Sequence, residues 1–179
     1  SKAIQNTIKP HAIVLGGYRT KFMNNTRKFF SRFNPNTPII ITNHQTAEMI
    51  KYANNSFLAT KISFINQLAS ICQKIPDTNI DDIAQTIGLD PRIGNLFLDA
   101  GPGYGGSCLP KDMKAIINLS SKVGVKPTML NAVEKTNKQQ INNIIELIKQ
   151  NIGKIKGKKI AVLGVAFKPN TDDIRDSMS

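Results

Sequence analysis

The chain has 179 residues, of which 40% are hydrophobic and 20% charged, a composition typical of a soluble globular protein. No apolar run approaches the roughly 20 residues that cross a bilayer, and the first residues lack the apolar core of a signal peptide, so no membrane partner is expected. Two cysteines, Cys72 and Cys108, are too few for a disulfide framework and predict a reducing, cytoplasmic location.

The balance of charge is strongly basic, because 24 Lys and Arg stand against 12 Asp and Glu, for a net charge of +12. Three interpretations are open: nucleic-acid binding, a solvated basic surface, or attraction of a diphosphate-bearing ligand. The basic residues are scattered, and their one dense cluster, at 154–159, contains no aromatic residue. This pattern favours a solvated surface and predicts no nucleic-acid partner, although charge alone does not choose.

The first elements expected along the chain are a strand, a helix and a second strand. Apolar runs at 12–17 and 38–42 predict the strands, and Thr20–Phe33 between them predicts the helix. Its expected apolar anchors are Phe22, Phe29, Phe30 and Phe33. Such a unit is too small to stand alone, so we expect it to be part of a larger α/β domain.

A long helix is expected next, from about His44 to Ile75. Its apolar residues recur at spacings of three, four or seven, which keeps them on one face and indicates a domain spine or a subunit interface. These residues are Ile50, Ala53, Phe57, Phe64, Leu68 and Ile71. A short helix over Ile80–Ile87 is expected to begin at a capping box of Thr78 and Asp81 and to close at Gly88.

Further helices are expected over Pro110–Val123 and, as one or two helices, over Pro127–Ile152. A glycine loop at 101–106 precedes them, and a lysine-rich connector follows. The apolar run at 159–165 predicts a strand that would open another α/β domain. The expected fold is therefore mainly α, a helical central domain with a long spine helix, flanked by partial α/β segments.

Cys108 directly follows the glycine loop, where its sulfur could be presented to a ligand. Lys111 and Lys51 are cations that could stabilise its thiolate, the form that attacks carbonyls. Asp112 comes four residues later and would face Cys108 if a helix begins near Pro110. The same pattern also fits an inert loop cysteine, so both readings stay open here.

Lys51 and Asn55 are four residues apart on the long expected helix, so their side chains lie on one face. A cation and an amide donor placed together could bind an oxyanion or orient a water, but they could also be ordinary residues of a solvated face. Cys72 lies beside the apolar face and is interpreted as core packing. We assign no metal ligands.

Neither glycine-rich segment forms a complete dinucleotide-binding loop. GPGYGG at 101–106 follows no expected strand and has the wrong spacing, and AVLGVAFKP at 161–169 lacks three glycines after its strand. We therefore expect most of any cofactor site to lie outside these residues.

Three segments resemble one family, the UDP-glucose/GDP-mannose dehydrogenases. GPGYGGSCLPKD (101–112) resembles the active-site signature, IKYANNSFLATKISFIN (50–66) the central helix, and VLGVAFKPNTDDIRDS (162–177) the entry to the C-terminal domain. They occur in the family's order, and the resemblance extends over the whole chain. DPRIG (90–94) and SCLPKD are more similar to the UDP-glucose 6-dehydrogenases than to the N-acetylhexosamine enzymes of the family.

The resemblance implies the oxidation of a sugar C6 alcohol to a carboxylate with two NAD per turnover. It implies that Cys108 captures the aldehyde as a thiohemiacetal, which then becomes a thioester. Lys51 and Asn55 match the pair that stabilises the oxyanion. Asp112 matches the carboxylate that assists the hydrolytic water.

The resemblance also implies where the ligands bind. NAD is expected to contact Cys108, Lys111 and Arg175. Arg92 matches a substrate-binding arginine that in this family reaches into the neighbouring subunit's site. The other expected contacts of the nucleotide sugar are Asp99, Ala100, Gly101, Pro102, Gly103, Tyr104, Gly105, Phe167 and Lys168.

By the same resemblance, residues 1–43 are the end of an NAD-binding Rossmann domain, and 44–153 are a central helical domain that forms a homodimer through its long helix. Residues 154–179 are a linker and the first strand of the domain that binds the nucleotide sugar. Because most of both outer domains is missing, we expect the chain alone to lack dehydrogenase activity. Two alternatives remain: a related dehydrogenase acting on GDP-mannose or a UDP-N-acetylhexosamine, and a non-catalytic basic helical module that binds a partner or nucleic acid.

Overall fold

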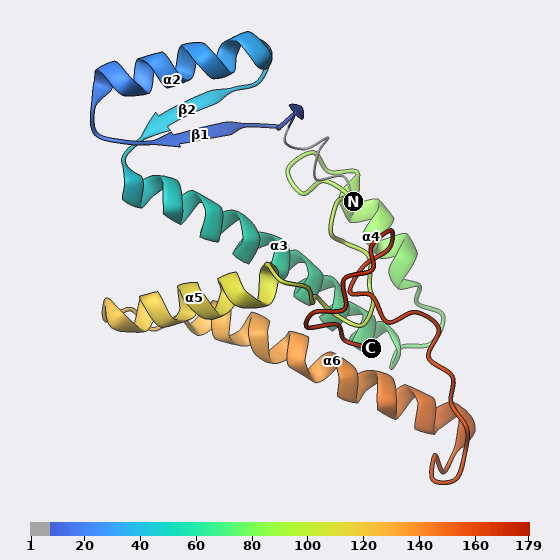
Figure 1. Ribbon diagram of the computed structural model, residues 1–179. Coiled ribbons are helices and arrows are strands. Elements are labelled where there is room, and N and C mark those ends of the chain that lie inside the picture. Colours follow the sequence, from blue (N-terminus) through green and yellow to red (C-terminus); the bar gives the residue numbers. More distant parts are fainter. Residues whose placement is uncertain (1–7) are drawn as a thin grey trace. The chain divides into compact units, whose positions relative to one another are not determined.

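The computed structural model describes residues 8–179 and is mainly helical, as expected (Figure 1). Its elements are β1 (Ile13–Gly16), α2 (Thr20–Phe33), β2 (Ile39–Thr42), α3 (His44–Cys72), α4 (Ile80–Gly88), α5 (Leu109–Lys122) and α6 (Thr128–Ile152). Contacts divide the chain into two compact units, one ending at Asn54 and one from Asn55 to Ser179. No helix in the described part is long and apolar enough to cross a membrane.

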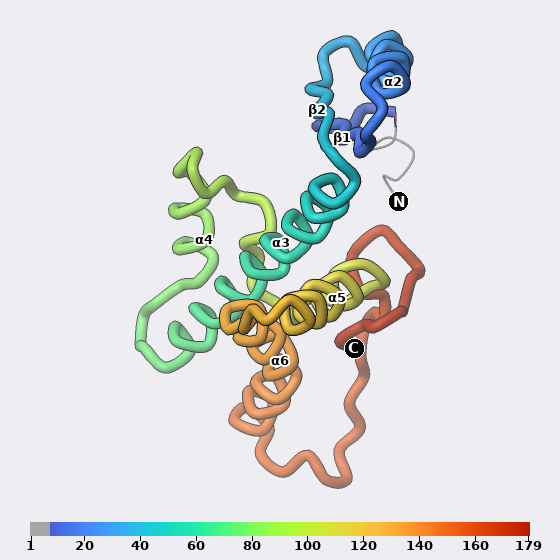
Figure 2. Tube along the Cα trace, turned by 90° about the vertical axis from the view of Figure 1, so that its left-hand side faces the viewer, coloured from blue at the N-terminus to red at the C-terminus, as the bar shows by residue number. Residues whose placement is uncertain are grey.

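The first unit pairs β1 with β2 in parallel, with Ile13 opposite Ile39. Parallel neighbours need a crossover connection, and α2 provides it, so the expected strand–helix–strand order is confirmed (Figure 2). The predicted role of the phenylalanines is wrong for most of them. No side chain of α2 is fully buried, and Phe33 is 68% exposed. Two short strands are too narrow to cover the apolar side of a helix of this length.

The core of the second unit joins α3, the glycine loop, α5 and α6. Its buried members are Ala59, Tyr104, Met113 and Val133. In both ribbon and tube views α5 lies along the first turns of α6 (Figures 1 and 2). The core therefore holds the glycine loop and the start of α5 against α3. The region predicted as one or two helices is the single helix α6.

The buried face of α3 is not the face that carries the predicted apolar stripe, so the stripe is not a spine packed within this chain, and its alternative role as a subunit interface stays a prediction. Phe57, Phe64 and Ile71 of the expected apolar stripe are exposed. The buried positions carry mostly small or polar side chains, namely Asn55, Ser56, Ala59, Ser63, Ile65, Asn66 and Ala69. Small side chains allow neighbouring backbone to approach closely, and the polar ones find partners there. For example, the Ser63 hydroxyl donates to the Val133 carbonyl at 3.2 Å.

The predicted capping box before α4 is also wrong. The Thr78 hydroxyl bonds backward, to the carbonyls of Cys72 at 2.9 Å and Ile75 at 2.8 Å, and so satisfies the end of α3. The N-cap of α4 is Asn79, whose side-chain oxygen accepts the backbone N–H of Asp81 at 2.8 Å. The Asn79 side chain can accept the N–H of the second residue after it. Asn79 therefore occupies the N-cap position that was expected for Thr78.

The strand predicted over 159–165 is absent from the structure, where this segment has no regular secondary structure. Its apolar side chains are exposed, and Leu163 is 95% exposed. A strand forms only when a neighbour supplies ladder hydrogen bonds, and no strand in the described part pairs with this segment. The chain then turns back, and the Gly106 N–H donates to the Arg175 carbonyl at 2.9 Å.

Candidate active site

Cys108 lies where the glycine loop becomes a helix. It is the N-cap residue of α5, its side chain is exposed, and its thiol makes no capping hydrogen bond. The Sγ atom lies 3.6 Å from the Ser107 hydroxyl oxygen. The sulfur therefore belongs to an exposed residue at the N-terminal end of a helix, where backbone N–H groups point outward.

The first turn of α5 carries a buried carboxylate. The Asp112 N–H donates to the Cys108 carbonyl at 2.9 Å, and Asp112 is only 2% exposed. Its Oδ2 accepts a hydrogen bond from Asn55 Nδ2 at 2.6 Å, and its Oδ1 pairs with the Lys111 ammonium. A buried carboxylate needs such partners to keep its charge. The structure thus brings together two expected site residues from α3 and α5, within the first turn after Cys108.

Lys51 lies on α3 one turn before Asn55, and its side chain is exposed. It belongs to the unit that ends at Asn54, whereas Asn55, Cys108 and Asp112 belong to the other unit. Its place in the oxyanion pair therefore stays a prediction.

Side-chain amides hold the glycine loop. The Gly101 N–H donates to Asn66 Oδ1 at 2.7 Å, and Gln140 Nε2 donates to the Gly101 carbonyl at 3.0 Å. Asn137 bonds both backbone groups of Tyr104, accepting its N–H at 2.8 Å and donating to its carbonyl at 3.0 Å. All three amides were missed from the sequence. The feature that could have revealed them is a polar residue at a position that faces the core of a long helix. Asn137 and Gln140, three residues apart on α6, are examples.

The expected substrate-binding stretch from Asp99 to Gly105 changes from exposed to buried along its length. Asp99 and Pro102 are exposed, whereas Tyr104 and Gly105 are buried. A Cβ on Gly103 would come within 2.5 Å of Asn137 Oδ1, and its φ of +109° is one that other residues rarely adopt. Glycine is needed here so that the backbone can reach its amide partner.

The C-terminal segment covers the end of the glycine loop. A Cβ on Gly106 would come within 2.6 Å of the Phe167 ring, and one on Gly105 within 2.2 Å of the Asp176 carbonyl oxygen. The Lys168 ammonium lies 5.2 Å from the centre of the Phe167 ring. The structure thus brings Phe167 from the third family-like segment onto the glycine loop that precedes Cys108.

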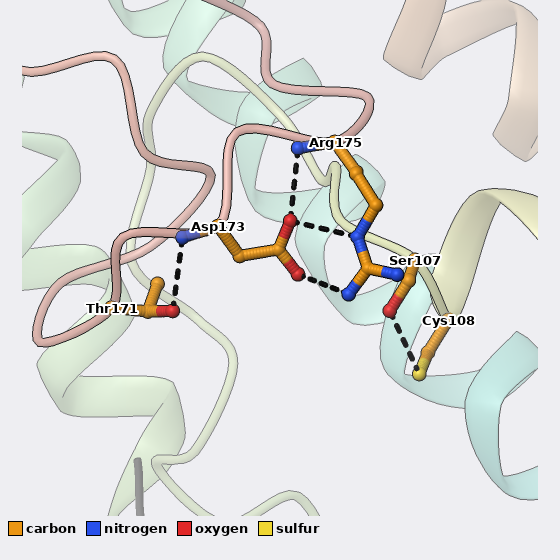
Figure 3. Close-up of polar contacts among 5 residues, drawn as sticks. All are labelled: Ser107, Cys108, Thr171, Asp173 and Arg175. Carbon is orange, nitrogen blue, oxygen red and sulfur yellow. Dashed lines mark hydrogen bonds and ion pairs between the residues drawn. The ribbon is translucent and has the colours of Figure 1, made fainter.

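Arg175 reaches the cysteine from the same segment. Its guanidinium binds Asp173 through Nε at 2.9 Å and a terminal nitrogen at 2.7 Å, and Figure 3 shows it beside Ser107 and Cys108. The hydrogen bond from Arg175 lowers the pKa of Asp173 to about 2. The hydrogen bond to Asp173 is the main cause that raises the pKa of Arg175, and the charge of Cys108 adds to it.

Arg92 stands apart from these contacts. Its side chain is 87% exposed and forms an ion pair with Asp90 at 2.6 Å, within the loop that follows α4. The contacts of this single chain do not bring Arg92 to Cys108, so its expected role toward a neighbouring subunit stays a prediction.

A cavity of about 220 Å³ adjoins the buried side of the loop, between α5, α6 and the last residues. Tyr104 is one of the residues that line it, and its buried hydroxyl has no hydrogen-bond partner in the described part of the chain. Burial, with a smaller effect from Glu134, raises the pKa of Tyr104 to about 12. Within residues 8–179 no group of three or more potential ligand side chains could hold a metal ion.

The described residues do not fit the phosphates of a dinucleotide cofactor. Among the described residues, the turn from a strand through glycines into a helix occurs between β1 and α2. The space beside its two glycines is already occupied by neighbouring side chains. A Cβ on Gly16 would lie 2.7 Å from Ala47 Cβ, and one on Gly17 2.2 Å from Met23 Sδ. A phosphate needs open amides at such a turn. The expected cofactor contacts of Cys108, Lys111 and Arg175 therefore stay predictions.

Comparisons with known proteins identify the family of this chain. The model of the UDP-glucose/GDP-mannose dehydrogenase family, central domain, matches residues 45–139. A UDP-glucose 6-dehydrogenase of Rickettsia felis is 44% identical over 177 residues, which are 98% of this chain and 39% of that protein.

Solved structures show the same fold. A UDP-glucose dehydrogenase from Pyrobaculum islandicum superposes with a TM-score of 0.88 at 34% identity, over 98% of this chain and 40% of that one. A UDP-D-ManNAc dehydrogenase from Pyrococcus horikoshii gives 0.82 at 26% identity, over 99% of this chain and 41% of that one. The chain thus spans about two fifths of the length of these relatives. It belongs to the UDP-glucose/GDP-mannose dehydrogenase family.

Proposed function

We propose that this chain carries the cysteine site of an enzyme that oxidises UDP-glucose to UDP-glucuronate through a thioester on Cys108. The observation that carries the proposal is the position of Cys108, exposed at the N-terminus of α5, whose first turn holds Asp112 in a buried pair with Asn55. A nucleophile at a helix start beside fixed polar groups is suited to acyl chemistry.

Each residue of the proposed site has its own role in the reaction. The Cys108 thiolate bonds to the C6 aldehyde carbon, and the carbonyl oxygen becomes an oxyanion that a nearby donor must stabilise. Lys51 and Asn55 are the proposed donors. After oxidation to the thioester, a water attacks the same carbon, and the Asp112 carboxylate assists by taking up its proton, while the thiolate leaves.

NAD is the proposed hydride acceptor, as in the family at large. Because the described residues form no phosphate-binding turn, we assign only Lys111, Arg175 and the sulfur of Cys108 as cofactor contacts. We therefore expect the 179-residue chain alone to produce no NADH from UDP-glucose.

The substrate is proposed to lie along the glycine loop, with Phe167 and Lys168 on one side and Arg92 reaching it from a second copy of the chain. A homodimer through α3 and a cytoplasmic location complete the proposal. The neighbour named for UDP-D-ManNAc keeps the N-acetylhexosamine nucleotides as the second candidate substrates.

Alkylation of the cysteines tests the proposal on the chain as it is. We expect neutral iodoacetamide to modify Cys108 faster than Cys72 at neutral pH, with both sites measured by mass spectrometry. The C6 aldehyde of UDP-glucose, which offers an electrophilic carbon, should slow the reaction at Cys108 more than UDP-glucose does. Equal rates at both cysteines with no protection by the aldehyde would refute a nucleophilic Cys108.

A further inference from the structure

The chain contains two aspartate–arginine forks of the same construction. In each fork, one carboxylate oxygen accepts hydrogen bonds from the backbone N–H and the Nε–H of the arginine. The other carboxylate oxygen accepts a hydrogen bond from a terminal nitrogen of the guanidinium. In that order the distances are 2.9, 3.0 and 2.6 Å for Asp90 and Arg92, and 3.0, 2.9 and 2.7 Å for Asp173 and Arg175. A fork of this kind fixes the direction of a guanidinium as well as its position.

The two forks differ in what they face. The Arg92 side chain is 87% exposed in a loop. The Asp173–Arg175 fork is tied to the cysteine loop, because the Gly106 N–H donates to the Arg175 carbonyl at 2.9 Å. In Figure 3 the Arg175 guanidinium lies between the Asp173 carboxylate and Cys108.

We propose that Arg175 is a positioning residue for Cys108, aimed by Asp173 so that its positive charge draws anionic groups to the sulfur. The inference rests on the proposed function, in which the carbon bound to Cys108 acquires an oxyanion and finally a carboxylate. In Figure 3 the guanidinium is drawn on the Cys108 side of the fork, and the charge of Cys108 acts on Arg175, so at the sulfur we expect the attraction of the guanidinium for negative charge to exceed the carboxylate's repulsion.

The other charges of the site are consistent with this role. Lys111, the nearest cation in sequence, is engaged by the buried Asp112 carboxylate. The charge of Cys108 contributes to the raised pKa of Arg175, after the effects of Asp173. Arg175 thus adds a cation to Cys108 from a segment far along the chain.

Charge-selective alkylation measures this effect without any substrate. Iodoacetate and iodoacetamide react with the same thiolate, so the ratio of their rates at Cys108 reports only the attraction of the anionic reagent. We expect Arg175→Gln to lower this ratio by at most about fivefold, the Boltzmann factor for isolated unit charges about 4 Å apart in water, because the Asp173 carboxylate offsets part of the attraction. Arg175→Lys should keep part of it. Lys122→Gln removes an equal charge about 20 Å away along α5 and should leave the ratio unchanged.

Salt provides a second test that needs no variant. In the unmodified chain the ratio should fall as ionic strength rises from about 0.05 M to about 1 M, whereas in Arg175→Gln it should be nearly flat. A ratio that is the same in Arg175→Gln and Lys122→Gln, or insensitive to salt in the unmodified chain, would overturn the role of Arg175. That result leaves the preferential alkylation of Cys108 over Cys72 intact, whereas loss of this preference would overturn the proposed function.

Discussion

The hydroxyl of Tyr104 is buried against a cavity without a hydrogen-bond partner in the described residues. An unsatisfied buried hydroxyl costs about 1 to 3 kcal/mol, so we expect Tyr104→Phe to raise the free energy of unfolding by about 1 kcal/mol at pH 7. Urea unfolding followed by circular dichroism measures this. A loss of stability in Tyr104→Phe would mean that the hydroxyl has a partner, such as a bound water in the cavity.

The same residue makes stability depend on alkaline pH. The pKa of Tyr104 in the folded chain is about 12, above its ordinary value of 10.0, so the folded state favours the protonated hydroxyl. Its contribution is complete below about pH 10 and is lost as pH rises towards about 12, which amounts to about 2 to 3 kcal/mol. We expect the unmodified chain to lose that much more stability than Tyr104→Phe over this window. Parallel curves for the two proteins would contradict the buried tyrosine.

Asn55 and Asp112 form a buried pair that a double-mutant cycle can measure. Asn55→Ala leaves the carboxylate with one partner fewer and should cost about 2 kcal/mol of unfolding free energy. We expect a coupling of at least about 1 kcal/mol between Asn55→Ala and Asp112→Ala. Asn118→Ala, an exposed amide on α5, is the matched control and should change little. Additive effects would show that the hydrogen bond contributes nothing.

This pair also shows what the sequence could predict at the scale of residues. Cys108, Asn55 and Asp112 were identified from the glycine loop and the resemblance. Their mutual contact was not, because 57 residues separate Asn55 from Asp112 and no local spacing encodes it. The fork of Asp173 and Arg175, by contrast, joins residues that are two apart in the sequence. Its position beside the cysteine loop depends on the C-terminal segment folding back onto that loop, which no local pattern encodes.

At the scale of elements, the caps around the α3–α4 turn can be separated by hydrogen exchange. We expect Asn79→Ala to cost about 1 kcal/mol and to lower the protection of the first amides of α4, because the Asp81 N–H loses its acceptor. Thr78→Ala removes hydroxyl bonds to the end of α3 and should leave α4 protected. Loss of protection in α4 from Thr78→Ala would restore the capping box that the sequence predicted.

The helices were predictable to within a few residues because each has a strong local signal. Glycines and prolines mark most of their ends, and apolar residues recur at helical spacing in α3, α5 and α6. The strand predicted over 159–165 is absent, because a strand forms only beside a neighbour that supplies hydrogen bonds, and the local sequence does not show whether one is there. The same local signal succeeded at β1, where β2 is present.

At the scale of the whole molecule, the apolar stripe of α3 is one of the surfaces that the single chain leaves exposed. Phe57, Phe64 and Ile71 are each seven residues apart, so they lie along one side of the helix, and all three are exposed. Side chains spaced in this way pack well against a second helix of the same kind. Of the two roles that the sequence left open for the stripe, a domain spine or a subunit interface, its exposure therefore favours the contact between two chains.

We expect the chain to form a homodimer through this stripe and Phe64→Glu to shift it to a monomer, since a charge at the centre of an apolar contact is costly to bury. Analytical ultracentrifugation at several concentrations measures the change. Val123→Glu adds the same charge at an exposed apolar residue just after α5 and is the matched control. If the unmodified chain is monomeric at every concentration, or if both variants dissociate it equally, the contact does not run through α3. Dissociation by Phe64→Glu alone, with helical content unchanged, would place the dimer contact on the face of the helix opposite Asn55 and Asn66, which hold the site.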